Sequence, residues 1–511
     1  MSASQREDRS RLDGFELEIF KLVREEATSD QWREWLRAPL EHAAAEGKFD
    51  LFTRLLDAGA DGSAGWRGCG GRTLLGAAAH GKNDDIVRTV LKAGVREDVN
   101  VCFGDRRESA LHVAAVQGAD NISGTLLIAG ADPNLLDGAG QSPLHVAASE
   151  GHHRVIRLLL LKGANANGKM SGWMHDTPLD LAAMRGHTSC VSELLLGGAE
   201  KDSGNCVGRT PLFTAAAENH PEVVKELLAA GANLDIRSIA GVSALDIAAF
   251  YGNVDVMRVL LGNGAGANAK HVENWKTALH HAAEPSRRGS DKGNAVGVLL
   301  KAGADIEAKT KDCASTPLHL SAFSRSPRSG AILALLEGGA DVNAEEVDRC
   351  TPLHLACSKS SVPAVELLLR WGANEKLVDN MGQTAADTLG SWDPQDDDDS
   401  DNSSIDDGSI DEQLEADGER IRQLLARAPA DRSWRRRGWL VLCRSCPTKV
   451  QISGGSSSCG RTAKAAKASE EDSGGGGTEQ QDEARINFGH LVDGIVGLEA
   501  DGVFRLVVGF I

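Results

Sequence analysis

The stretch that decides the fold runs from Thr351 to Asn374 and reads TPLHLACSKSSVPAVELLLRWGAN. Thr351 can cap a helix, and Pro352 suits the first position of that helix. A second helix follows, whose leucines at 367–369 need a partner surface, and Gly372 supplies the positive φ that ends it. Because such a helix pair cannot bury its own apolar faces, it must stack on copies of itself.

The leucine of the Thr-Pro-Leu-His motif recurs along most of the chain and serves as a marker of each copy. It is found at Leu40, Leu74, Leu111, Leu144, Leu179, Leu212, Leu245, Leu279, Leu318 and Leu353, with a weaker eleventh position at Ala386. The pattern resembles the ankyrin repeat, which has a period of about 33 residues and the motif Thr-Pro-Leu-His-x-Ala. The resemblance covers residues 36–428. It implies an all-α ankyrin-repeat solenoid of helix-turn-helix units with β-hairpin-like finger loops.

Glycine and asparagine mark the predicted ends of the first helices, because both tolerate the left-handed turn that closes a helix. The predicted ends are Gly47, Gly81, Gly118, Gly151, Gly186 and Gly252, with Asn219 in one repeat. Two repeats depart from the pattern. The second has Arg72-Thr73 in place of Thr-Pro, which leaves its cap open. The eleventh is split, with a first helix predicted at Gln383–Leu389 and a second at Glu419–Arg427.

The net charge of −18 is concentrated in one segment. Between Asp393 and Glu419 there are 13 acidic residues and no basic ones, so the rest of the chain carries only −5. A nearly balanced array disfavours a purely electrostatic nucleic-acid binder. High charge with few apolar residues predicts that the acidic segment is disordered.

Composition divides the chain into six predicted segments. These are an N-terminal tail and capping helix at 1–35, ankyrin repeats at 36–390, a disordered acidic insert at 391–418, a last repeat helix with a basic and aromatic C-terminal cap at 419–446, a flexible low-complexity linker at 447–485 and an apolar C-terminal segment at 486–511. The N-terminal helix either covers the end of the stack or binds a partner separately. The last segment suggests two short strands, and a lone hairpin is only marginally stable in water.

Cysteine use predicts an intracellular setting. The ten cysteines lack the spacing of a disulfide framework, and neither a signal peptide nor a run of about 18 apolar residues is evident. We therefore expect the cytoplasm, with the nucleus as an alternative. Cys443, Cys446 and Cys459 with the distant His490 could form a zinc site, but structural zinc usually has a second close ligand pair. We predict no metal and no cofactor.

Five histidines invite a catalytic interpretation, but their position favours a structural one. They occupy the fourth place of the motif at His112, His145, His280, His319 and His354. The resemblance implies that each bonds the Ser or Thr at the start of its motif, or adjoining backbone. They belong to different repeats and share no carboxylate or cysteine at a useful spacing. Phosphate-loop, nucleophile-elbow and zinc-protease motifs are absent, so we predict no catalytic residues and no enzyme activity.

After the array the charge reverses, with nine Lys or Arg and no Asp or Glu over residues 432–469. Within Arg432–Arg444, the apolar residues can close the end of the stack while Arg435, Arg436 and Arg437 meet the acidic insert. A nuclear import signal, an anionic-membrane contact or a nucleic-acid contact would each use the same arginines.

The connections between repeats carry the candidate binding residues. Five connections, counted from the glycine after a second helix to the next marker residue, exceed the usual 14 residues, and four of them contain a large aromatic ring: Trp66, Phe103, Trp173 and Trp275. A ring on an extended loop has little core to join, and Trp is enriched among binding hot spots. We hypothesise that these rings line the partner-binding side. The alternative is that each ring folds back over its neighbouring repeat.

The resemblance and the missing catalytic motifs favour a non-catalytic scaffold or adaptor that binds a protein partner on the finger and concave surface. No small-molecule substrate is predicted. One alternative is a nuclear regulatory protein that uses the basic stretch Arg432–Arg444. Another is an ankyrin targeting subunit of an enzyme complex.

Overall fold

The computed structural model describes residues 29–60, 72–93, 99–172, 174–284, 292–324, 329–391 and 415–428, with side chains from residue 36 onward. All of them belong to the first of two units into which the chain divides, Met1–Cys443. In these ranges the regular structure is helical, apart from isolated β-bridges such as those that pair Phe103 with Glu108 and Val378 with Thr384. The predicted all-α solenoid is confirmed.

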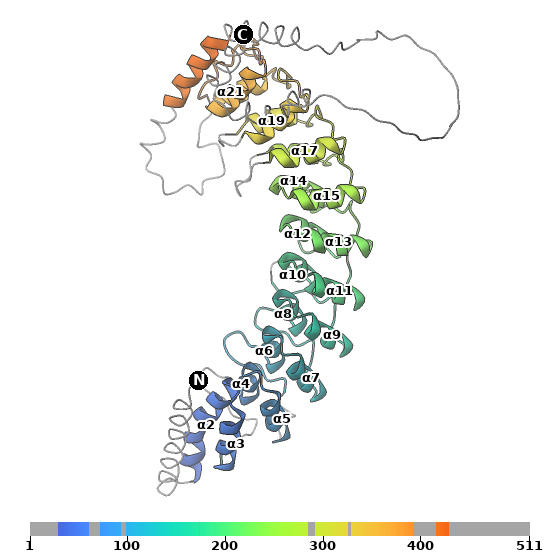
Figure 1. The fold of residues 1–511 in the computed structure, drawn as a ribbon, viewed down its shortest axis with the longest axis vertical. Coiled ribbons are helices and arrows are strands. Elements are labelled where there is room, and N and C mark those ends of the chain that lie inside the picture. Colours follow the sequence, from blue (N-terminus) through green and yellow to red (C-terminus); the bar gives the residue numbers. More distant parts are fainter. Residues whose placement is uncertain are drawn as a thin grey trace, which may run out of the picture. The chain divides into compact units, whose positions relative to one another are not determined.

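Two kinds of helix alternate along the array, and consecutive helix pairs stack in chain order (Figure 1). The first helices of the pairs are α2 (Ser29–Ala45), α4 (Leu74–His80), α6 (Ala110–Gln117), α8 (Pro143–Glu150), α10 (Pro178–Arg185), α12 (Pro211–Ala217), α14 (Ala244–Tyr251), α16 (Ala278–Ala283), α18 (Pro317–Ala322) and α20 (Pro352–Ser358). The second helices are α3 (Phe49–Asp57), α5 (Asp84–Lys92), α7 (Asp120–Ile128), α9 (His153–Leu161), α11 (Thr188–Leu196), α13 (Pro221–Ala229), α15 (Val254–Gly262), α17 (Gly293–Lys301), α19 (Gly330–Glu337) and α21 (Val362–Arg370). A further helix covers residues 415–428.

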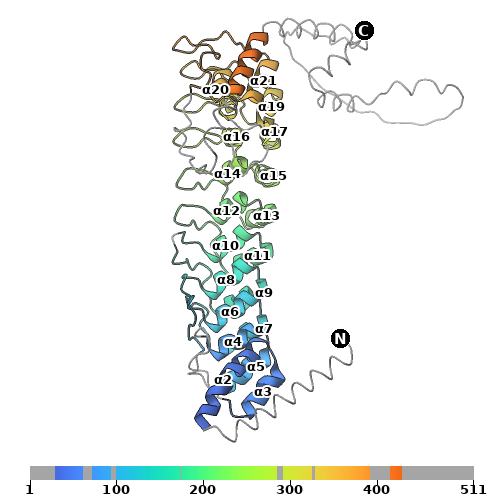
Figure 2. The same ribbon diagram turned by 90° about the vertical axis from the view of Figure 1, so that its left-hand side faces the viewer.

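The array has three layers. Figure 2 shows the first helices in the middle, the second helices on one side and loops on the other. We call each loop that leads from a second helix to the next marker position a finger. Alanines of the first helices meet leucines of the second helices in the core, where Ala147, Ala148 and Leu159 are fully buried. Because each pair packs mainly on its neighbours, the stability of the array should approach a sum of neighbouring interfaces.

Each motif histidine closes the start of its helix and reaches the next repeat. The N–H of Ser142 donates to Nδ1 of His145 over 3.2 Å, and the Ser142 hydroxyl lies 2.8 Å from the same atom. Since Nδ1 accepts a backbone N–H, the ring proton sits on Nε2, which donates to the Gly168 carbonyl at 2.9 Å. The same contacts recur at His112, His280, His319 and His354. The structural interpretation of these histidines is confirmed.

Burial keeps four of these rings neutral. It lowers the pKa of His145, His280 and His319 to about 4, and it also lowers the pKa of His112. The unfolded chain would bind protons near pH 6.5, whereas the folded rings do not. These histidines therefore stabilise the fold fully at neutral pH, and their contribution is lost as pH falls from about 6.5 towards 4.

Aspartate replaces the motif histidine in α10 and α14. Asp180 accepts the N–H and hydroxyl of Thr177 at 2.9 and 2.8 Å, but a carboxylate cannot donate to the next finger. Asp246 caps its helix in the same way and also pairs with Arg237 at 3.0 Å. Asp180 has no such ion pair in the described part of the chain, its Oδ1 is buried without a hydrogen-bond partner there, and burial raises its pKa to about 7.

Two boundaries between the predicted segments do not coincide with the ends of helices in the structure. The predicted boundary between residues 35 and 36 falls inside α2, which runs without a break from Ser29 to Ala45. The helix at 415–428 begins before residue 419, so it overlaps the predicted acidic insert. Residues 392–414 of that insert, together with the linker at 447–485 and the segment at 486–511, lie outside the described residues.

The predicted first helix of the eleventh repeat is wrong, because Thr384 pairs with Val378 in a β-bridge and residues 385–390 form turns. The N–H and hydroxyl of Thr384 both donate to Oδ2 of Asp387, at 2.9 and 2.6 Å. Gly390 then takes a left-handed φ of 65°. The cap at Thr384 and the left-handed Gly390 are so close in sequence that only a short turn forms between them.

Gly81 was predicted to end its helix with a left-handed turn, and the structure gives a different reason for this glycine. Its φ is −70°, and the left-handed residue of this turn is Lys82, with a φ of 54°. Gly81 is needed for space, since a Cβ at this position would lie 2.0 Å from the carbonyl oxygen of Ala44. The cap left open by the sequence is also present, because Thr73 accepts the N–H of Gly76 at 3.0 Å.

Gly81→Ala should destabilise the array by about 1–3 kcal/mol, because the new methyl group would overlap main chain of the preceding repeat. Gly124→Ala in α7 is the matched control. Its Cβ would meet nothing within 4 Å, so we expect unchanged stability or a gain of up to about 1 kcal/mol. Chemical denaturation of both variants checks this, and equal effects would contradict the packing role of Gly81.

Asp180→Asn should stabilise the array more at pH 8 than at pH 5. The folded pKa of Asp180 is about 7 against an ordinary value of 3.8, so ionisation costs stability as pH rises through this interval. The gain in the free energy of unfolding on substitution should be larger at pH 8 than at pH 5 by about 1 kcal/mol or more. Denaturation of wild type and variant at both pH values measures it.

Asp246→Asn is the control for this measurement. It removes a carboxylate that is paired with Arg237, so it should destabilise the array at both pH values. An Asp180→Asn effect that is the same at pH 5 and pH 8 would show that Asp180 titrates normally in the fold.

Candidate protein-binding surface

Neighbouring fingers are joined by main-chain hydrogen bonds. The N–H of Ile239 donates to the Val207 carbonyl at 3.0 Å, and the N–H of Val347 donates to the Cys313 carbonyl at 2.9 Å. Equivalent bonds join Gly138 to Arg106, Cys206 to Met174, Lys311 to Asn274 and Asn380 to Asp348. These six bonds hold the tips of the fingers that they join in place through the main chain, so side chains there can change without breaking the contact.

Asparagine side chains tie the fingers at their bases. Nδ2 of Asn134 donates to the Gly163 carbonyl at 3.1 Å, and its Oδ1 accepts the N–H of Asn165 at 2.8 Å. The same double contact is made by Asn100, Asn167 and Asn268. Because these fingers are held at the base as well as at the tip, their exposed residues project from fixed points.

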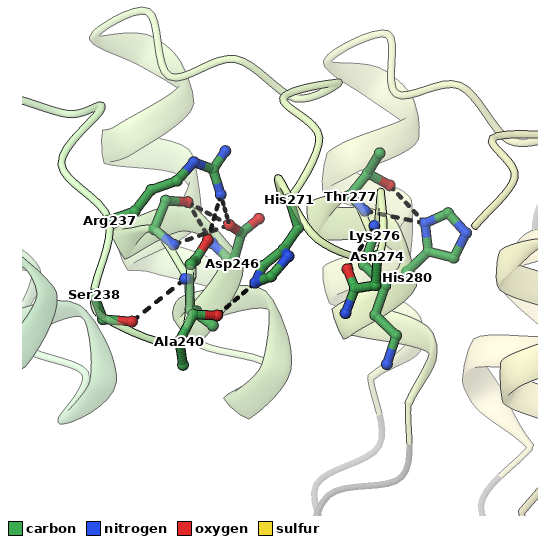
Figure 3. Close-up of polar contacts among 12 residues, drawn as sticks. Arg237, Ser238, Ala240, Asp246, His271, Asn274, Lys276, Thr277 and His280 are labelled. Atoms are coloured by element: carbon green, nitrogen blue, oxygen red, sulfur yellow. Dashed lines mark hydrogen bonds and ion pairs between the residues drawn. The ribbon is translucent and has the colours of Figure 1, made fainter. Parts of the chain in front are cut away.

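The fingers before α14 and α16 are joined by side chains (Figure 3). Arg237 donates to the Asp246 carboxylate at 3.0 Å and to the Gly241 carbonyl at 2.8 Å. His271 of the next finger reaches back, and its Nε2 donates to the Ala240 carbonyl. A motif histidine would donate a hydrogen bond to the next finger, which the Asp246 carboxylate cannot do. The hydrogen bond from His271 to the preceding finger joins the two fingers instead.

Large apolar side chains are exposed on the fingers from the one before α14 onward, and we call five of them the finger row. The exposed fractions are 76% for Ile239, 75% for Val272, 46% for Trp275, 60% for Val347 and 82% for Met381. Of these residues, the sequence prediction included only Trp275. The other four share a signal that could have revealed them, because each is apolar and lies five to seven residues before a marker position.

Trp275 occupies a backbone position that suits glycine. Its φ is 57°, and the equivalent residue in other fingers is Gly140, Gly208, Gly241 or Gly382, with φ between 72° and 76°. The remaining equivalents are Arg107, His175, Ala314 and Arg349. A left-handed backbone costs a side-chain-bearing residue about 1–2 kcal/mol. Lys270 Nζ lies 5.3 Å from the centre of the Trp275 ring, within the range of a cation–π contact.

The structure places the other predicted rings differently. Phe103 is only 6% exposed, and its ring fills the space beside Gly76, where a Cβ would lie 2.3 Å from the ring. Phe103 thus folds back over the neighbouring repeat, which is the second of the two alternatives. Trp66 and Trp173 lie outside the described residues, and so do Arg435, Arg436 and Arg437.

The titratable groups of the array serve packing and capping. Burial raises the pKa of the Cys190 and Cys357 thiols to about 12, so both stay protonated inside the stack. Within the ranges that the structure describes, no group of three or more His, Cys, Asp or Glu side chains could hold a metal ion. No described helix is long and apolar enough to cross a membrane. Cys443, Cys446, Cys459 and His490 lie outside these ranges.

Similarity to known proteins is partial. The chain is 40% identical over 77 residues to the Caenorhabditis elegans ankyrin repeat and LEM domain-containing protein 1 homolog, which covers 15% of this chain and 11% of that protein. It is 36% identical over 89 residues to human ankyrin repeat domain-containing protein 37, covering 17% and 55%. The chain thus spans little more than half the length of these relatives at most. The crystal structure of the human ASB11 ankyrin repeat domain aligns with a TM-score of 0.37 and 26% identity, covering 52% of this chain and 97% of that domain.

Family models give the wider match. The model for three copies of the ankyrin repeat matches residues 40–137, 111–205, 179–271 and 245–346, and the model for many copies matches residues 335–389. Together these matches run from residue 40 to residue 389 without a gap and cover more than half of the chain. They fall on the same helix pairs and fingers that the structure shows, and the chain therefore belongs to the ankyrin-repeat family.

Proposed function

We propose that this protein is a non-catalytic scaffold or adaptor that binds a protein partner through the finger row. Ankyrin repeats generally mediate protein–protein interaction, and proteins built from them are typically non-catalytic. The observation that carries the proposal is Trp275, a half-exposed aromatic side chain on a left-handed backbone position. Glycine would fit that backbone without strain, so packing alone does not account for the ring.

The surroundings of Trp275 support an interface. Ile239 and Val272 are about three-quarters exposed on the fingers that His271 joins, and Trp is among the residues most enriched in binding hot spots. The fingers are already ordered by main-chain and side-chain hydrogen bonds. A partner would therefore meet a rigid surface, and association would cost little further ordering of the fingers.

The two alternative functions use other parts of the chain. A nuclear regulatory role depends on Arg432–Arg444, which lies outside the described residues. A role in targeting an enzyme complex would use the same finger row. One relative, the Arabidopsis thaliana E3 ubiquitin-protein ligase KEG, is 31% identical over 110 residues, which cover 7% of that protein. The exposed apolar residues of the finger row support protein binding, which a scaffold or adaptor shares with an enzyme-targeting subunit, and the more general role is our first proposal.

Trp275→Gly should abolish partner capture without harming the fold. Loss of the ring removes a hot spot of about 2 kcal/mol or more, whereas relief of the left-handed strain leaves stability unchanged or raises it by up to about 1 kcal/mol. Affinity capture with the full wild-type and variant chains, followed by mass spectrometry, measures the first effect. Thermal unfolding measures the second.

Ala314→Gly is the matched control, because Ala314 occupies the same left-handed position one finger further on, with a φ of 53°. It relieves the same strain but removes only a methyl group, so it should retain every protein that the wild type retains. If Trp275→Gly retains the same set, the proposed role of Trp275 is wrong.

A further inference from the structure

A cavity of about 200 Å³ lies on the finger side of the second and third repeats, away from the finger row. Its apolar lining comes from Phe103, Val113 and Val116, of which Val116 is 39% exposed. Pockets for small-molecule ligands usually measure about 300–1,000 Å³. This cavity is smaller, and its size suits a single side chain of a larger partner.

A local departure from the repeat pattern creates the cavity. Gly76 lies two residues after its marker leucine, where the next two repeats carry Val113 and Val146. The missing side chain leaves a gap that the Phe103 ring fills only in part. Phe103 is held there by a two-way main-chain pairing with Glu108, at 2.9 and 3.1 Å. The cavity therefore results from the sequence and main-chain pairing of these two repeats.

Positive charge surrounds the opening. Arg72 and Arg106 line the cavity from two successive fingers, and the Arg106 side chain is 85% exposed. One carboxylate, Glu108, lies 3.8 Å from Arg106, while Arg72 makes no ion pair with another described residue. His80 also lines the cavity. Two guanidinium groups against one carboxylate leave an excess of positive charge beside an apolar floor.

We propose that this cavity binds an apolar side chain of a partner protein whose adjacent residues are acidic. The apolar side chain enters beside Phe103 and Val116, and its acidic neighbours meet the guanidinium groups of Arg72 and Arg106. Arginine suits this role because its planar fork can donate two hydrogen bonds to one carboxylate. The inference rests on the proposed protein-binding function but assigns a second contact, on repeats other than those of the finger row.

The test is a selection of displayed random peptides on the full wild-type chain. We expect enriched peptides to place Asp or Glu next to a Leu, Ile, Met or Phe. The dissociation constant of a synthetic enriched peptide should rise by about tenfold or more in Arg72→Glu and in Arg106→Glu, because like charges then face each other. Val116→Trp narrows the cavity without changing its charge and should weaken binding similarly.

Arg157→Glu is the control. Arg157 is exposed on α9, away from the cavity, and its substitution changes the net charge of the protein by the same amount. It should leave the affinity unchanged, and thermal unfolding should show that all four variants stay folded. A selection that yields no peptide dependent on Arg72, Arg106 and Val116 overturns the inference. If selected peptides instead depend on Trp275 alone, this inference fails while the proposed function stands.

Discussion

The hydrogen bond from a neutral motif histidine to the next finger is the interaction on which the array depends. In α8 the ring of His145 accepts the Ser142 N–H on Nδ1 and donates from Nε2 to the Gly168 carbonyl. One side chain thus closes the start of a helix and positions the loop that follows it. Burial lowers the pKa of His145 to about 4, so both contacts are intact at neutral pH. Where a repeat carries the motif histidine, that repeat also positions the finger that follows it.

Two of the repeats without a motif histidine show how this constraint shapes the binding surface. Asp180 and Asp246 cap their helices but have no proton to donate forwards. Asn205 bonds back to Asp176 at 3.0 Å after the first of them, and His271 bonds back to Ala240 after the second. The finger that carries Trp275 is therefore held by its neighbours. These contacts can maintain a left-handed tryptophan that an isolated loop would relax.

Much of this architecture could be predicted from the sequence, because the repeated motif specifies local contacts. The marker leucines, the capping role of His145 and the left-handed Gly372 each depend on a few neighbouring residues, and the structure confirms them. The predictions that were wrong concern residues whose role depends on contacts between repeats. The burial of Phe103 follows from the gap at Gly76, which lies 27 residues earlier, and the need for Gly81 follows from the main chain at Ala44. No pattern within one repeat carries that information.

Part of the candidate site was also hidden for a physical reason. The length of its finger drew attention to Trp275, but the strain that makes it informative is a backbone angle. Ile239 and Met381 sit in fingers of ordinary length, so loop length did not mark them, and their exposed fractions of 76% and 82% come from the structure. A repeat motif describes what the copies share, whereas a binding surface is made where they differ.

Hydrogen–deuterium exchange of the full chain, alone and with a protein that it retains, tests the central claim most directly. If the finger row is the interface, binding should slow exchange at the backbone amides of residues 237–242 and 271–276 and leave the second helices α7, α9 and α11 unchanged. Slowed exchange confined to those second helices, with the fingers unaffected, would contradict the account.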